Sequence, residues 1–215
     1  MLKYLAVFLF IFISSIDLIM IVQKQEIRRN YTKPLIIPAI FFFYLQWSTH
    51  YQYWLLFALF FSFLGDLLLL FSEKKHYFRG GLFAFLCSHI SYCALFISDL
   101  SFQSIIHSPL TWSVFLYLFF AGWFLYYLRA YLGHYRLAVL FYSITIMTMS
   151  YTSLLRYEMM QGINFWFPWI GTLFFILSDT LLAFRNFKYG QKKGWVSVMA
   201  TYILAQFFIT LGYLF

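Results

Sequence analysis

The sequence is short of charge. Asp, Glu, Lys and Arg make up 10% of the 215 residues, whereas 63% are hydrophobic and 26% are aromatic. A soluble globular domain is usually about a quarter charged. This shortage excludes an ordinary soluble domain, and the composition indicates an integral membrane protein.

Polar segments long enough to form a separate domain are also missing. A membrane-crossing helix needs about 20 mostly apolar residues, and the sequence contains eight such runs separated by short polar breaks. We expect spans at 2–22, 34–50, 53–71, 81–98, 109–128, 136–155, 165–184 and 195–215. The predicted fold class is therefore all-α, a polytopic bundle of eight transmembrane helices that forms one integral membrane domain over residues 1–215.

Cysteine and deeply placed histidine are scarce. The two cysteines, Cys87 and Cys93, fall in one predicted span at a spacing that points them in different directions, so we interpret them as small packing residues. Of the five histidines, His89 alone lies deep in a span, whereas a buried metal site needs several His or Cys ligands. Serine-elbow and phosphate-loop motifs are absent from the sequence. We expect no metal and no other cofactor.

Basic residues are distributed unevenly along the chain. Thirteen of the 15 follow the first, third, fifth and seventh spans: Lys24, Arg28, Arg29, Lys33, Lys74, Lys75, Arg79, Arg129, Arg136, Arg185, Lys188, Lys192 and Lys193. The positive-inside rule then places these breaks in the cytoplasm and both termini outside it. We interpret the net charge of +8 as a signal for orientation and for anionic lipid, with no nucleic-acid partner. The expected location is a bacterial inner membrane.

Two similar apolar runs each contain one acid. "FSFLGDLLLLF" at 61–71 and "FFILSDTLLAF" at 174–184 agree at six of eleven positions, which include Asp66 and Asp179. At 1.5 Å per residue, both acids and Asp17 lie about 7–8 Å inside the cytoplasmic boundary, and His89 lies about 12 Å inside it. Ionisable residues inside a membrane usually mark a functional site, and the mouth of this one should face the cytoplasm. Acids four spans apart on equally oriented helices are what a parallel duplication of a four-helix unit produces.

Two buried carboxyl groups and a histidine suit general acid–base catalysis. One carboxyl group can donate a proton while the other stabilises the cation that results, which is the division of work in glycosidases. The alternative to catalysis is that such residues only form hydrogen bonds between helices. It applies most readily to Asp17, and also to the weaker polar faces formed by Tyr202 and Gln206 in the last span and by Tyr142, Thr145 and Thr152 in the sixth.

The chain resembles the YhhN family in a series of ordered blocks. They are "TKPL", "FSFLGD", "GGLFAFLCSHISY", "GTLFFILSDTLLAFRNF" and "YILAQFFI", and the match runs from about residue 32 to the end. The resemblance implies an eight-helix membrane hydrolase that cleaves the vinyl-ether bond of lysoplasmalogens. The products would be a fatty aldehyde and a glycerophospho-base.

The implied reaction gives the buried residues roles. Asp66 and Asp179 would be catalytic, one as proton donor and one as stabiliser of the cation, with His89 as an orienting or relaying group and Tyr92 as its support. The substrate would be a lysophospholipid such as lysoplasmenylethanolamine or lysoplasmenylcholine, in contact with membrane lipid. The expected substrate-binding residues are Tyr92, Lys33, Lys74, Lys75, Arg79, Arg185, Tyr202 and Gln206.

Two other classes of protein remain open. Paired membrane acids also serve proton-coupled transporters, although a pair of Gly/Pro-broken helices at mid-membrane is absent from the sequence. A lipid-binding membrane protein would have dispensable acids. Aldehyde release from a lysoplasmalogen distinguishes the hydrolase from both, and the oligomeric state stays open.

Overall fold

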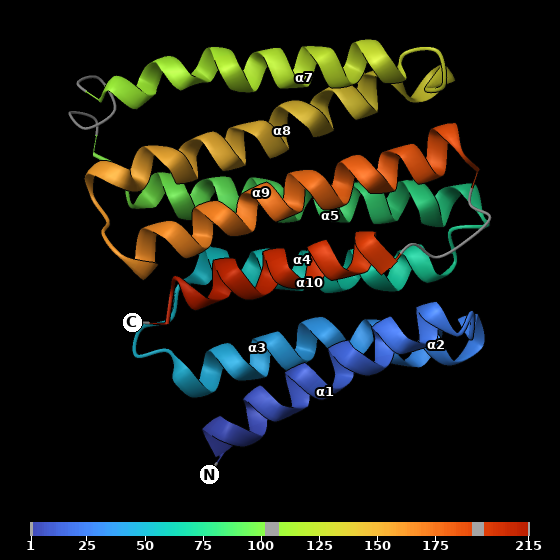
Figure 1. Cartoon of the computed structure of the whole chain (residues 1–215), viewed down its shortest axis with the longest axis horizontal. Coiled ribbons are helices and arrows are strands. Elements are labelled where there is room, and N and C mark those ends of the chain that lie inside the picture. Colours follow the sequence, from blue (N-terminus) through green and yellow to red (C-terminus); the bar gives the residue numbers. More distant parts are fainter. Residues whose placement is uncertain (1, 102–107, 191–195, 215) are drawn as a thin grey trace.

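The computed structural model describes residues 2–101, 108–190 and 196–214, and all regular structure within these ranges is helical. The α-helices are α1 (Leu2–Val22), α2 (Glu26–Thr32), α3 (Ile36–Trp47), α4 (Tyr53–Leu70), α5 (Lys75–Ser98), α7 (Val114–Leu128), α8 (Arg136–Leu155), α9 (Ile163–Ala183) and α10 (Val196–Leu211). Short 3₁₀ segments are η1 (Lys33–Leu35), η2 (Pro109–Ser113), η3 (Gly133–Tyr135) and η4 (Arg156–Glu158), and η5 (Phe184–Lys188) is a π-helix. The long helices run alongside one another, with α7 at one edge of the bundle and α1 at the other (Figure 1).

The helices match the apolar runs of the sequence. Within the described residues, six helices are long and apolar enough to cross a membrane: those spanning Leu2–Val22, Tyr53–Leu70, Lys75–Ser98, Pro109–Leu128, Gly133–Glu158 and Ile163–Lys188. The last predicted span corresponds to α10, an apolar helix of 16 residues. The chain is therefore a multi-pass helical membrane protein, as predicted. The fourth span begins earlier than expected, because α5 starts at Lys75 rather than at residue 81.

The second span differs most from its prediction. Residues 34–50 were expected to form one helix, but α3 covers only Ile36–Trp47 and is preceded by η1 and by α2, a helix that we did not predict. Pro34 explains the break, since it has no backbone N–H to continue an α-helical ladder. Pro38 lies in the first turn of α3, where a proline is tolerated. The chain tightens into a 3₁₀ turn at Lys33–Leu35, and this turn leaves the Lys33 side chain buried inside the bundle.

Two tight helical hairpins form the centre. α4 packs along α5, and α9 packs along α10. Gly65 makes the first approach close, because a Cβ atom there would lie 2.7 Å from the Phe85 ring. Gly171 does the same in the second hairpin, where a Cβ atom would lie 2.9 Å from the Ala205 carbonyl oxygen. Small residues at contact points are typical of packed transmembrane helices.

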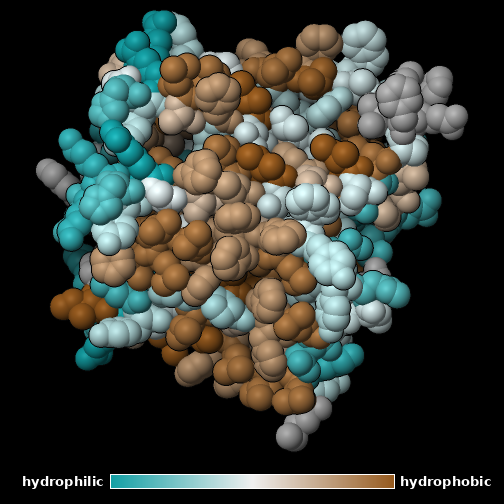
Figure 2. Space-filling model, turned by 180° about the vertical axis from the view of Figure 1, so that it is seen from behind, coloured by the Kyte–Doolittle hydropathy of each residue, from teal (hydrophilic) through white to brown (hydrophobic). Residues whose placement is uncertain are grey.

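The surface is divided by polarity. A broad apolar band crosses the middle of the molecule, and hydrophilic side chains gather along the left edge of Figure 2, which corresponds to the end that carries α2 in Figure 1. α1 begins and α10 finishes at the opposite end (Figure 1). The basic breaks and the two chain ends therefore lie at opposite ends of the bundle, as the charge pattern predicts.

Candidate active site

A polar cavity of about 390 Å³ opens inside the bundle at the basic end. Both acids of the repeated runs, Asp66 on α4 and Asp179 on α9, line it. Its other polar or charged lining residues are Arg29, Asn30, Lys33, Ser72, Glu73, Ser178, Arg185, Asn186 and Tyr202. The structure thus brings the two acids into one cavity, although they are more than a hundred residues apart in the chain.

An apolar cavity of about 370 Å³ adjoins the polar one. Its walls come from α5, α7, α8 and α9, and most of its lining residues are hydrophobic, including Leu86, Phe124 and Ile146. Phe83 and Phe141 also line it, and they are 66% and 62% exposed on the outer surfaces of α5 and α8. The apolar cavity therefore reaches the lipid-facing surface. Asp179, Leu182 and Asn186 line both cavities, so the two meet at Asp179.

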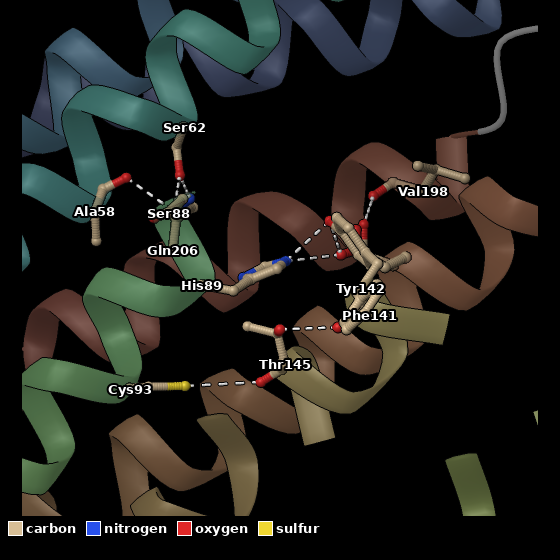
Figure 3. Close-up of polar contacts among 12 residues, drawn as sticks. Ala58, Ser62, Ser88, His89, Cys93, Phe141, Tyr142, Thr145, Val198 and Gln206 are labelled. Carbon is tan, nitrogen blue, oxygen red and sulfur yellow. Dashed lines mark hydrogen bonds and ion pairs between the residues drawn. The ribbon is translucent and has the colours of Figure 1, made fainter. Parts of the chain in front are cut away.

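Asp179 is held through one of its oxygens. Its Oδ2 accepts a hydrogen bond from the Tyr142 hydroxyl at 2.6 Å and lies 2.9 Å from His89 Nε2. The Tyr142 hydroxyl is also 2.9 Å from His89 Nε2, so three side chains from α5, α8 and α9 meet at one point. Figure 3 shows His89 reaching across from α5 toward Tyr142. The His89 ring is fully buried and packs edge-on against Phe175.

Asp66 is held through both oxygens. Its Oδ1 forms an ion pair with Lys33 Nζ at 3.2 Å, and its Oδ2 accepts a hydrogen bond from the Tyr202 hydroxyl at 2.8 Å. Asp66 is 2% exposed and Lys33 is 8% exposed, so the pair is shielded from bulk water. A buried charge needs such a partner, because leaving it unpaired costs about 3–5 kcal/mol.

Tyr92 and Gln206 belong to a different cluster. The Tyr92 hydroxyl donates to Gln206 Oε1 at 2.6 Å, and Gln206 Nε2 donates to Ser62 Oγ at 2.8 Å. Ser88 completes the cluster with a contact to Ser62 Oγ at 2.8 Å (Figure 3). Neither Tyr92 nor Gln206 lines either cavity. The contact between Tyr92 and His89 that we expected is replaced by this buried network, which joins α4, α5 and α10.

Asp17 serves the link between α1 and α2. Its Oδ1 accepts a hydrogen bond from Thr32 at 2.8 Å and lies 3.7 Å from Arg29 Nε. Asp17 is fully buried and lines neither cavity. Asp17 thus lies outside both cavities and contacts the α2 segment, although it is near enough to Asp66 for their charges to interact. These contacts are those of a packing residue, which is the interpretation that the sequence favoured.

The basic residues expected at the headgroup are divided among several places. Lys33 and Arg185 line the polar cavity. Arg79 lines the apolar cavity, where its guanidinium lies over the Tyr135 ring. Lys74 and Lys75 line neither cavity; Lys74 Nζ lies 6.0 Å from the centre of the Tyr77 ring.

Four residues at the cavities were not predicted as site residues. Tyr142 was expected only to form a weaker polar face, and Arg29, Asn30 and Asn186 were not expected at the site. Tyr142 sits about 9 Å into its span at 1.5 Å per residue, which is close to the depth of Asp179. Depth was therefore a signal that could have placed it at the site. Arg29 and Asn30 line the cavity because α2 folds over it, and the pattern of the sequence did not reveal that helix.

The donor set of the site suits proton transfer. Within the described residues, no group of three or more His, Cys, Asp or Glu side chains is arranged to hold a metal ion. Three carboxyl groups (Asp66, Glu73 and Asp179) and the Tyr202 phenol line the polar cavity, and Tyr142 lines the apolar one. The His89 imidazole lines neither cavity and joins the site through its contacts with Asp179 and Tyr142. Such groups donate protons and stabilise positive charge.

The comparisons with known proteins agree with the blocks found in the sequence. The model of the YhhN family matches residues 28–213, from α2 to just beyond α10. The match leaves out α1, which contains Asp17. No curated protein and no solved structure matches the chain.

Proposed function

The chain belongs to the YhhN family, and from this premise we propose that it is a membrane hydrolase that cleaves the vinyl-ether bond of lysoplasmalogens. The substrate is a single-chain lipid with a glycerophospho-base, such as lysoplasmenylethanolamine or lysoplasmenylcholine. The products are a fatty aldehyde and the glycerophospho-base. The reaction takes place at the cytoplasmic side of a bacterial inner membrane.

One observation carries this proposal: Asp179 lies where an apolar cavity meets a polar cavity. A lysoplasmalogen has the same division, with a hydrocarbon chain on one side of the vinyl ether and a glycerophosphate on the other. With the chain in the apolar cavity and the headgroup in the polar one, the scissile bond falls beside Asp179. Phe83 and Phe141 mark where the chain enters from the bilayer, because they line the apolar cavity and are exposed to lipid.

The charges of the polar cavity suit a zwitterionic headgroup. Arg29, Lys33 and Arg185 supply positive charge, and Glu73 supplies negative charge in addition to the ionised site acid. Guanidinium groups bind phosphate well because their donors match its oxygens. Arg29 and Arg185 therefore bind the phosphate, and Glu73 faces the amine of the base.

The chemistry needs two acids and water. A carboxylic acid protonates the β-carbon of the vinyl ether, which gives an oxocarbenium ion next to the ether oxygen. The second acid, as a carboxylate, stabilises this cation. Water from the polar cavity adds to the cationic carbon and returns one proton to the site. The resulting hemiacetal then collapses to aldehyde and alcohol.

Two other functions predict different behaviour. A proton-coupled transporter would move protons across proteoliposomes in response to a substrate gradient, with no change in the lipid. A lipid-binding protein would bind lysoplasmalogen without converting it. A cavity that reaches the hydrocarbon at Phe83 and Phe141 favours a lipid ligand over a water-soluble one.

The test is aldehyde release by the purified protein in nanodiscs supplied with lysoplasmenylethanolamine. We expect one aldehyde for each lipid consumed. The matched control lipid is the 1-O-alkyl analogue, which has the same chain and headgroup but no double bond to protonate, and it should remain intact. Absence of aldehyde from the vinyl ether, with bound lipid recovered unchanged, would reject the hydrolase.

A further inference from the structure

The two central hairpins have corresponding residues at the same spacing. His89 on α5 follows Asp66 on α4 by 23 residues, and Tyr202 on α10 follows Asp179 on α9 by 23 residues. The equivalence is structural as well as sequential, because the residue before each acid touches the equivalent position of the following helix. Gly65 faces Phe85, and Ser178 Oγ donates to the Val198 carbonyl oxygen at 3.0 Å.

The hairpins exchange partners. Asp66 of the first hairpin accepts a hydrogen bond from Tyr202 of the second, and Asp179 of the second hairpin contacts His89 of the first. Each acid is therefore held by the second helix of the other hairpin. The two acid sites are equivalent in position, and the chemistry of their partners is what distinguishes them.

Asp66 has a partner of fixed charge. Lys33 Nζ lies 3.2 Å from Oδ1, and the Tyr202 hydroxyl donates to Oδ2, so both oxygens accept from donors. A carboxyl group that carried a proton would lose one of these contacts, because an O–H group faces a donor unfavourably. These two contacts favour Asp66 as a carboxylate, in opposition to the burial that disfavours its charge.

Asp179 has partners without a fixed charge. Tyr142 and His89 both contact Oδ2, and among the described residues nothing hydrogen-bonds to Oδ1. A protonated carboxyl group keeps a carbonyl oxygen that accepts hydrogen bonds, so Oδ2 can stay bound while Oδ1 carries a proton. The other charged groups that line the cavities around Asp179 are Arg29, Lys33, Asp66, Glu73, Arg79 and Arg185.

We propose that the two acids have different and fixed roles, with Asp179 as the proton donor through Oδ1 and Asp66 as the permanent carboxylate that stabilises the oxocarbenium ion. The inference rests on the proposed hydrolysis. The Oδ1 proton moves to the β-carbon, the electrons of the double bond form the new C–H bond, and positive charge develops at the carbon attached to the ether oxygen. After water adds there, one of its protons returns to Asp179, and the acid is restored.

Tyr142 and His89 are positioning residues for Asp179. They fix Oδ2 and thereby aim Oδ1, since a carboxyl group held at one oxygen retains little rotational freedom. His89 Nδ1 is buried and has no hydrogen-bond partner among the described residues. The ring therefore has one polar contact point, at Nε2, and it orients Asp179 instead of relaying protons to solvent.

A pair of lipid analogues tests the division of roles by binding alone. One analogue carries a secondary amine in place of the ether oxygen and is a cation at pH 7; the other is the neutral 1-O-alkyl ether of the same chain and headgroup. The ratio of their dissociation constants gives the cation preference of the site. We expect wild type to prefer the cation, Asp66→Asn to lose at least about tenfold of that preference, and Asp179→Asn to keep it within about twofold.

Loss of the preference in Asp179→Asn, its retention in Asp66→Asn, or its absence in wild type would overturn the division of roles. Asp17→Asn is the control for a buried acid that lines neither cavity. It should keep the wild-type cation preference, because any change passed through its partner Arg29 acts on the headgroup, which both analogues share. Aldehyde release is measured separately on the wild-type protein. If aldehyde forms and the preference depends on Asp179, the division of roles is wrong while the hydrolysis stands; if no aldehyde forms, the hydrolysis itself is wrong.

The positioning role of Tyr142 has its own readout. Tyr142→Phe should lower kcat at least about tenfold and leave KM and the cation preference within about twofold of wild type, because the substrate still binds while the proton donor is misaimed. Tyr151→Phe, on the same helix but bonded to the Thr111 carbonyl oxygen, should match wild type. A rise in KM at unchanged kcat for Tyr142→Phe would assign this residue to substrate binding instead.

Discussion

Two acids of the same type occupy equivalent positions in the two hairpins, and the proposed reaction needs each of them. We expect Asp66→Asn and Asp179→Asn each to lower turnover at least about a hundredfold, the usual scale for losing a general acid or a charge stabiliser, because Asn cannot donate the proton or carry the charge. The double variant should be scarcely slower than the slower single variant if the acids act as one unit. The measurement is aldehyde release in nanodiscs.

The control for this pair of substitutions is Asp17→Asn, whose effect should be mild. Asp17 is fully buried, and among the described residues its side chain contacts Thr32 and Arg29. A folded Asp66 or Asp179 variant that keeps more than about a third of wild-type turnover would return that residue to the packing role of an interhelical hydrogen-bond partner.

Individual residues show where the sequence was informative and where it was not. The repeated acidic runs predicted Asp66 and Asp179 as a pair, and the structure places both in one cavity. Depth along a span also placed His89 near the acids, and it contacts Asp179. The sequence could not predict which side chains contact one another, because depth along a span does not give the direction in which a side chain points. Tyr92 was consequently expected at the site and lies in another network.

Among the helices, glycine in α4 decides how closely the first hairpin packs. We expect Gly65→Ala to lower the stability of the folded protein by about 1–3 kcal/mol, because its Cβ atom would overlap the Phe85 ring. Phe85 lines the polar cavity, so activity should fall as well. Thermal unfolding in detergent, followed by intrinsic fluorescence, measures the change.

Gly122→Ala is the matched control for this substitution. Gly122 lies in α7, and nothing lies within 4 Å of a Cβ atom built there. The change should leave stability unchanged or raise it by up to about 1 kcal/mol, since Ala favours a helix more than Gly does. Equal destabilisation by both substitutions would show that the loss of stability does not come from the packing of Gly65 against Phe85.

The π-helix η5 after α9 brings polar side chains to the cavities. Arg185 and Asn186 lie in this turn and line the polar cavity; π-helical turns occur frequently at functional sites. We expect Arg185→Gln to raise KM for lysoplasmenylethanolamine about tenfold and to leave KM for an alkenylglycerol without phosphate unchanged, because only the phosphate needs the guanidinium. Steady-state kinetics with the two substrates provides the measurement.

Lys188→Gln tests whether charge in general explains the result. Lys188 belongs to the same π-helix, but its Nζ contacts the Tyr127 hydroxyl and it lines neither cavity. Its KM values should match those of wild type. If Arg185→Gln raises KM equally for both lipids, the substitution has damaged the site as a whole, and the change does not report recognition of the phosphate.

Helix boundaries were predictable where apolar runs were long and uninterrupted. The first predicted span, 2–22, coincides with α1, and 136–155 coincides with α8. The region before α3 was not predictable in detail, because a short helix with charged residues reads as a polar loop in the sequence. Pro34 predicted a break in the helix, but the sequence did not predict that this break brings Lys33 into contact with Asp66.

At the scale of the whole molecule, the distribution of charge predicts the orientation in the membrane. Of the two basic residues away from the basic breaks, Arg156 is 1% exposed and its Nε donates to Asp99 Oδ2 at 2.9 Å. This ion pair cancels the charge of Arg156 within the bundle. Lys3 is then the basic residue left at that end. At the other end Arg29 and Lys33 are paired in the same way with Asp17 and Asp66, which leaves eleven of the thirteen, and the asymmetry that the positive-inside rule uses remains.

The orientation follows from this asymmetry, and reporter fusions test it. A periplasm-active reporter fused after Phe215 should be active, whereas one inserted at Gln191, outside the described residues and between α9 and α10, should be inactive. A reporter that is active only in the cytoplasm should give the opposite pattern at both positions, which controls for expression. If both reporters give the reverse of these patterns, the basic end and the mouth of the polar cavity lie outside the cytoplasm. The headgroup would then have to reach Asp66 and Asp179 from the periplasmic leaflet, and the substrate pool available to the site would change accordingly.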